Sequence, residues 1–200
     1  MKKRIKYNQI NKINRGEIMT NMDEKTYKIQ IDSYNEYLEN LKKLVSNTNN
    51  LESLIEKVDD YPLNLRGNIL YNLGGALNHE RYFKSISQYK TNISNNLLEQ
   101  IKKDFNSVEN LEKEILNESL KLKGSGYVNL VLDNNKLRII LTSNEDIPEY
   151  YGFKTLMTID LWEHAYIIMY ELDRYTYVKR LLEHINYEYI SKIYEEKNQK

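Results

Sequence analysis

The sequence predicts an α+β protein: an N-terminal α-helical hairpin, followed by a lobe in which helices surround a three-stranded antiparallel sheet. Three observations favour this class. Apolar residues recur at helical spacings through the N-terminal half, a β-hairpin pattern follows Gly126, and helical patterns return after a third strand-like run. We therefore expect a helical-hairpin domain over residues 23–90 and an α+β domain over residues 91–200 of the 200-residue chain.

Residues 1–22 differ from the rest, because they are basic and show no clear apolar period. The first sixteen residues contain six Lys or Arg and no acidic residue. We expect a flexible, solvated tail, and a role for it in localisation stays open. The tail lacks the apolar segment of a signal peptide, so export is not indicated.

Two long amphipathic helices are expected in the N-terminal domain. The first begins near Asp23, ends near Val45 and carries apolar side chains at spacings of three and four: Tyr27, Ile31, Tyr34, Leu38, Leu41 and Leu44. A short helical piece, LESLIEKV, follows and stops before Pro62. The second long helix fits residues 64–89, with one apolar side formed by Ile69, Leu70, Leu73, Leu77 and Tyr82.

The C-terminal half mixes helices and strands. Helices fit residues 96–105 and 108–122, the second capped by Ser107 and ended by the Gly124-Ser125-Gly126 turn. The segments YVNLVL and KLRIILT flank the turn residues Asp133-Asn134-Asn135 and predict a β-hairpin. A third strand fits residues 154–160, and three further helices fit residues 162–172, 174–184 and 187–196.

Composition excludes several classes of function. Lys and Arg number 29 and Asp and Glu 29, so no positive surplus favours nucleic-acid binding. No apolar run reaches the roughly 18 residues of a membrane span, and we expect a cytoplasmic protein. The chain has no Cys, which excludes disulfides and thiolate metal sites. A metal would therefore need carboxylates and some of the three His.

Asp160 and His164 are the strongest candidates for chemistry. They flank the only Trp of the chain in IDLWEHAY, where an apolar strand gives way to a helix. A carboxylate and an imidazole in such apolar surroundings need each other or a cation. His79, on the second long helix, is either a structural residue or a third ligand, and a His–Asp–His set suits iron, manganese or zinc. We expect His184 to be an exposed residue at a helix end.

Several segments resemble the iron/manganese superoxide dismutases. GGALNHERYF, GSGYVNLVL, TSNEDIP and IDLWEHAY occur in the family's order and at similar separations, and the likeness extends through YVKRLLEHINYEYISKIY. The resemblance covers about residues 24–196. It implies the same two-lobed fold, a homodimer, and one iron or manganese ion per subunit that dismutates superoxide.

The resemblance also implies roles for single residues. His79, Asp160 and His164 match three of the family's metal ligands. Tyr37 matches the Tyr at the mouth of the active-site funnel, and Trp162 matches the Trp that lines the cavity. Glu163 matches the Glu that reaches across a twofold interface to His164 of the partner subunit.

Several positions depart from the family pattern, among them Ser33, Ile167, Tyr127 and Ala76, and two further departures bear most directly on the metal site. The family's remaining ligand is a His eight positions before the Tyr at the funnel mouth, and here that position is Ile29; no His precedes His79. Glu145 stands where manganese-type members carry a Gln that donates a hydrogen bond toward the metal. An ionised Glu145 cannot donate that bond, and its negative charge favours the trivalent metal.

Three interpretations follow from these matches and departures. The reduced ligand set, with or without Glu145, still binds iron or manganese and dismutates superoxide. Alternatively, the chain is a catalytically inactive homologue with a structural or partner-binding role, in which Ile29 fills the former site. In the third, the open coordination positions serve another metal-dependent oxidation.

Overall fold

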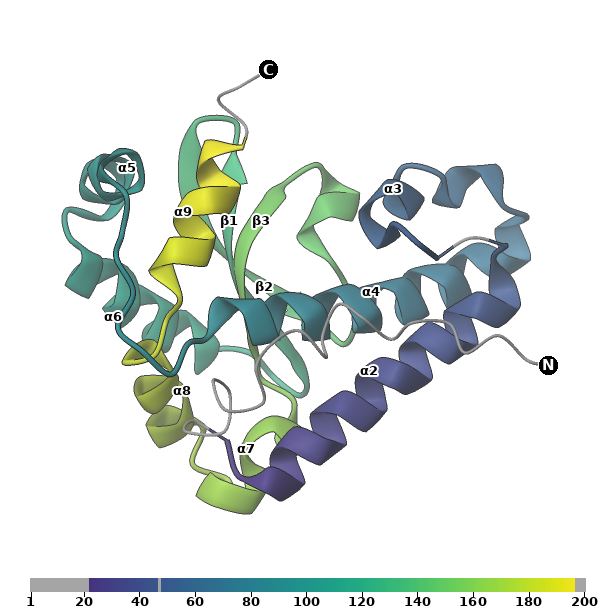
Figure 1. Cartoon of the computed structure of the whole chain (residues 1–200), viewed down its shortest axis with the longest axis horizontal. Coiled ribbons are helices and arrows are strands. Elements are labelled where there is room, and N and C mark those ends of the chain that lie inside the picture. Colours follow the sequence, from purple (N-terminus) through teal and green to yellow (C-terminus); the bar gives the residue numbers. More distant parts are fainter. Residues whose placement is uncertain (1–21, 47, 197–200) are drawn as a thin grey trace.

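In the computed structural model, which describes residues 22–46 and 48–196, two long helices lie side by side ahead of a mixed C-terminal lobe (Figure 1). These helices are α2 (Glu24–Leu44) and α4 (Leu63–Ser85). The short helix α3 (Leu51–Ile55) and the 3-10 helix η2 (Val58–Asp60) connect them. The predicted basic tail falls almost entirely outside the described residues.

Local sequence explains where the two long helices begin and end. The Asp23 side chain caps α2 by accepting hydrogen bonds from the backbone N–H groups of Lys25 and Thr26. Pro62 precedes α4, where a missing N–H group is tolerated. α4 ends at Ser85 rather than at the expected residue 89, because Ile86 turns into an isolated β-bridge with Ile185.

The sheet is antiparallel and has β1 at its centre, in the order β2-β1-β3. Its strands are β1 (Gly126–Asp133), β2 (Lys136–Ser143) and β3 (Lys154–Asp160). Asn134, in the turn between β1 and β2, has a φ of 55°, which Asn tolerates better than most residues. β1 is buried along nearly its whole length, so the core lies on both of its faces.

Helices surround this sheet, as the sequence predicts. α5 (Asn95–Phe105) and α6 (Val108–Ser119) contact β2, while α4 and α9 (Tyr187–Glu195) contact β3. α7 (Glu163–Tyr170) packs on α2 and on α8 (Arg174–Leu182), and a 3-10 helix, η3 (Pro148–Tyr151), precedes β3. The α+β prediction is confirmed. No helix in the described part of the chain is long and apolar enough to cross a bilayer.

Two contacts between the lobes bring their functional residues together. α4 packs along β3, and α7 packs against α2 near the start of that helix (Figure 1). β3 ends at Asp160 and α7 begins at Glu163, so their junction faces both long helices. Residues more than one hundred positions apart can therefore contribute to one site.

Candidate metal centre

His79 lies in the C-terminal half of α4 and has no exposed surface. Its Nδ1 is 2.7 Å from the backbone oxygen of Gly75, one helical turn earlier. That carbonyl can only accept, so Nδ1 carries the proton and Nε2 keeps a lone pair. Nε2 is buried without a hydrogen-bond partner among the described residues. It is therefore free to act as a ligand atom.

Asp160 is held firmly at the end of β3. Its Oδ1 accepts a hydrogen bond of 2.8 Å from the backbone N–H of Trp162. Its backbone oxygen accepts one of 2.8 Å from the Tyr177 hydroxyl, which in turn lies 3.1 Å from the hydroxyl of Tyr82. These bonds fix the strand end, and Oδ2 points away from them toward α7, 3.3 Å from Nε2 of His164.

His79, Asp160 and His164, hereafter the His–Asp–His cluster, meet at one point. One potential ligand atom from each lies within 4.8 Å of the other two. The two imidazole rings stack with centroids 5.8 Å apart. Nε2 of His79 lacks a hydrogen-bond partner, whereas Nε2 of His164 faces Oδ2 of Asp160 at 3.3 Å. Buried polar atoms without partners are rare in proteins, and a cation held between the three side chains would satisfy Nε2 of His79. Two imidazoles and a carboxylate fit iron, manganese or zinc.

The charges of the cluster are coupled. Burial alone would raise the pKa of Asp160, but the adjacent His164 keeps it below its ordinary value. Burial would lower the pKa of His164, and the Asp160 carboxylate raises it above its ordinary value. For His79 burial dominates and holds the pKa below 6.5. His79 is thus a neutral imidazole at pH 7, which is the form that binds metals.

Gln30, on the first long helix α2, contacts the cluster. This side chain is fully buried, and its Nε2 donates a hydrogen bond of 2.7 Å to Oδ2 of Asp160. Its Oε1 is buried without a partner. The sequence comparison assigned the absent ligand to Ile29, one position earlier, which is only half-buried. The structure thus brings Gln30, which sequence reasoning missed, to Asp160.

Tyr37 and Glu145 lie together beside the cluster. The Tyr37 ring lies 5.6 Å from that of His79, and its hydroxyl donates a hydrogen bond of 2.8 Å to Glu145. Tyr127 donates one of 2.9 Å to the other oxygen of Glu145. Both carboxylate oxygens are therefore occupied, and Glu145 is not among the clustered potential ligands of the described chain.

Burial gives Glu145 an unusual charge state. It raises the pKa of the carboxyl group from 4.5 to about 7, although the two tyrosine hydroxyls act in the opposite direction. About half of the Glu145 side chains would then be protonated at neutral pH.

Consecutive glycines on α4 permit these close approaches. A Cβ on Gly75 would lie 2.4 Å from the ring of Tyr37, and one on Gly74 would lie 1.8 Å from the backbone oxygen of Glu145. Neither distance is compatible with a side chain. Gly74 and Gly75 thus allow the Glu145 backbone and the Tyr37 ring to pack directly against the helix that carries His79.

Trp162 and Glu163 lie at the N-terminus of α7. The Trp162 indole stacks on His164 with ring centroids 5.7 Å apart, and its Nε1 is buried without a partner. Glu163 is partly exposed and accepts a hydrogen bond of 2.8 Å from the Ser125 hydroxyl. Trp162 thus covers the cluster, whereas Glu163 faces the surface.

Comparison with known families agrees with this geometry. The family model described as iron/manganese superoxide dismutases, C-terminal domain, matches residues 81–193, which is more than half of the chain. The chain belongs to the iron/manganese superoxide dismutase family. The matched range includes Asp160 and His164, but His79, Tyr37 and Gln30 precede it. The match of this superoxide dismutase homologue therefore spans its C-terminal lobe and the end of α4.

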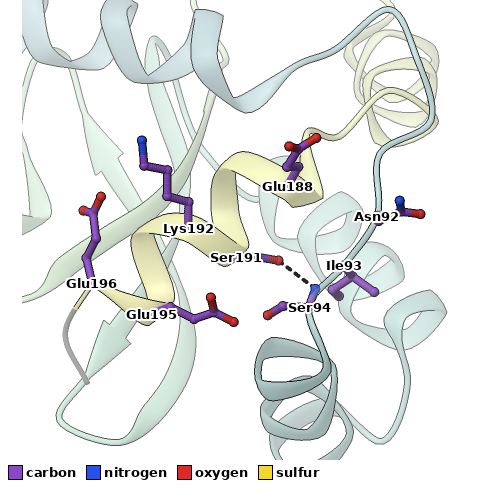
Figure 2. A pocket seen from close by; sticks show the side chains of 8 residues that line it. All are labelled: Asn92, Ile93, Ser94, Glu188, Ser191, Lys192, Glu195 and Glu196. Atoms are coloured by element: carbon purple, nitrogen blue, oxygen red, sulfur yellow. Dashed lines mark hydrogen bonds between the residues drawn. The ribbon is translucent and has the colours of Figure 1, made fainter. Parts of the chain in front are cut away.

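A surface hollow lies elsewhere, between α9 and the segment before α5 (Figure 2). Ser191 and Ser94 meet there through a hydrogen bond of 2.9 Å from the Ser94 backbone N–H. Three glutamates and Lys192 surround them. None of the site residues predicted from the sequence lines this hollow, so it is separate from the candidate metal centre of the dismutase homologue.

Proposed function

We propose that this protein dismutates superoxide at an iron or manganese ion held by the His–Asp–His cluster. The observation that carries the proposal is the meeting of His79, Asp160 and His164, whose potential ligand atoms lie within 4.8 Å of one another, with Nε2 of His79 buried and without a hydrogen-bond partner. The ion, when bound, supplies one-electron redox chemistry: one superoxide is oxidised to dioxygen, and a second takes up an electron and two protons to give hydrogen peroxide.

The chain's own residues would control access and protons. Tyr37 and Glu145 form a hydrogen-bonded pair next to His79, and both groups carry exchangeable protons. A carboxyl group with a pKa of about 7 can hold or release a proton near neutral pH. Trp162 covers His164 with an apolar surface, which restricts the entry of larger molecules.

Removal of one imidazole tests this function. Protein purified without added metal, or reloaded with Fe²⁺ or Mn²⁺, is expected to hold close to one equivalent per chain and to consume superoxide. His79→Leu should retain less than about a tenth of that metal and lose the activity, because a buried ligand is gone. His184→Leu, a half-exposed His outside the cluster, is the matched control. Elemental analysis and a superoxide assay give both readouts, and a reloaded wild type without metal would rule the proposal out.

One observation favours the alternative function of a catalytically inactive homologue. Gln30 donates a hydrogen bond to Oδ2 of Asp160, the same oxygen that faces His164. That bond partly compensates the buried carboxylate without any cation. Under this alternative the wild type contains no iron or manganese, but it folds and assembles normally.

We further propose that the chain forms a homodimer through α7. Five large apolar side chains are exposed on α7, which begins at Glu163, in the connection to α8 and at the start of α8: Ile167, Ile168, Met169, Leu172 and Tyr175. Exposed apolar groups this close together favour a protein interface. They also suit the family arrangement in which this Glu reaches His164 of the partner subunit.

A charge placed in this patch is expected to separate the subunits. Ile167→Glu should weaken self-association at least about ten-fold, because an unpaired carboxylate would be buried in the interface. Leu63→Glu is the matched control, since Leu63 is 82% exposed and lies on α4, outside the patch. Sedimentation velocity over a concentration series measures the effect. A monomeric wild type, or equal weakening by both variants, would contradict the interface.

A further inference from the structure

We propose that the side-chain amide oxygen of Gln30 is a fourth protein ligand in the metal centre. The inference rests on the metal binding proposed above and deepens it, because it completes the ligand set from the first long helix. Neither the composition nor the family pattern assigns a role to this residue. Its position in the folded chain does.

The surroundings of Gln30 point to a missing partner. The side chain has no exposed surface, yet Oε1 makes no hydrogen bond. An acceptor buried in this way costs about 1–3 kcal/mol when it stays unsatisfied. The other end of the amide is fixed, since Nε2 donates to Asp160 at 2.7 Å. Oε1 is bonded to the same carbon as Nε2, so it too lies close to that carboxylate.

Two unpartnered atoms of the site share one property. Oε1 of Gln30 and Nε2 of His79 both carry lone pairs, whereas Nε2 of His164 faces Oδ2 of Asp160 at 3.3 Å. The N–H of Gln30 donates to the Asp160 carboxylate, the strongest acceptor nearby, so Oε1 is the end of the amide that is left without a partner. A cation would satisfy Oε1, Nε2 of His79 and Asp160 together.

The donor set then has a definite chemical character. Amide and carboxylate oxygens suit manganese and other hard cations, whereas imidazoles also suit iron and zinc. Two imidazoles, one carboxylate and one amide oxygen are therefore well suited to manganese. The bond from Nε2 to Asp160 need not break on ligation, because Oε1 is a separate atom of the amide. Hydrogen bonds of this kind orient ligands in metal sites.

Two substitutions of Gln30 separate ligation from hydrogen bonding. Gln30→Leu removes both amide atoms, and we expect it to weaken Mn²⁺ binding at least about ten-fold. Gln30→Glu keeps an oxygen but loses the N–H donor, and we expect it to bind Mn²⁺ at least as tightly as the wild type does. Ile29→Leu, at the half-buried neighbouring position, should leave affinity unchanged. Chelator competition on metal-stripped protein measures each affinity.

A second readout is the visible absorption of the Co²⁺-loaded protein, which depends on the number and type of ligands. The spectrum should change in Gln30→Leu and stay the same in Ile29→Leu. Far-ultraviolet circular dichroism and melting temperatures of the metal-free variants establish that each one folds. If Gln30→Leu does not fold, Gln30→Glu alone tests the inference, because Glu is close to Gln in size and shape.

Three results would overturn the inference. Unchanged or tighter Mn²⁺ binding by Gln30→Leu would mean that the amide only fills space. Weakening in Gln30→Glu as large as in Gln30→Leu would mean that Gln30 acts only as an N–H donor to Asp160. A wild type that binds no metal after reloading would overturn the proposed function as well, and this result is distinguishable because it appears before any variant is compared.

Discussion

Gln30→His is expected to raise the affinity for Mn²⁺ at least about ten-fold, whereas Ile29→His is expected to leave it unchanged. Gln30 is fully buried and contacts Asp160, so an imidazole at this position would reach the His–Asp–His cluster. Ile29 is half-buried on a different side of the helix, and an imidazole there would not be directed at Asp160. Chelator competition on both variants, beside the wild type, measures the difference.

The pair of variants tests which position of the first helix faces the metal centre. Counting along the sequence favours residue 29, and the folded chain favours residue 30. A rise in affinity confined to Ile29→His would contradict the placement of α2 described above. Melting temperatures of the two metal-free variants serve as the control for folding.

The metal-free wild type is expected to lose stability as the pH rises, and the metal-free Glu145→Gln variant is expected to lack this loss. Burial raises the pKa of Glu145 in the folded state from 4.5 to about 7. Between these values the folded wild type binds a proton that the unfolded chain has lost, so its stability falls as pH rises. The amide of Gln does not titrate, and this loss is absent in the variant.

The expected difference is about 2–3 kcal/mol in the free energy of unfolding between pH 4.5 and pH 8. Urea denaturation of both proteins at the two pH values measures this difference. Because the pH effect in the variant is subtracted from that in the wild type, the contributions of the other titrating groups cancel. Glu163→Gln is the control, because Glu163 is partly exposed. An equal pH dependence of wild type and Glu145→Gln would show that the folded protein carries Glu145 at an ordinary pKa.

Much of the architecture was predictable from local patterns. The third strand occupies residues 154–160 as expected, and the hairpin strands differ from prediction by a residue at their ends. Apolar periodicity and turn residues act within short segments, so they can be recognised without tertiary information. The early end of α4 was not predictable, because it depends on a bridge between Ile86 and the distant Ile185.

The environment of Glu145 also depended on long-range contacts. Its partners are Tyr37 from α2 and Tyr127 from β1, and its backbone rests on Gly74 of α4. The sequence comparison singled out Glu145 as a change from Gln. It could not foresee that two tyrosine hydroxyls would donate hydrogen bonds to both carboxylate oxygens.

The sequence by itself determined the fold class and the candidate ligands His79, Asp160 and His164, because each lies in a short motif whose residue types carry the chemistry. Only the tertiary structure decided which residue of the first helix joins them. One position along an α-helix is a rotation of about 100°, so a step from Ile29 to Gln30 exchanges a residue beside the site for one inside it. Packing of α2 against α4 and α7, rather than any local pattern, sets that rotation.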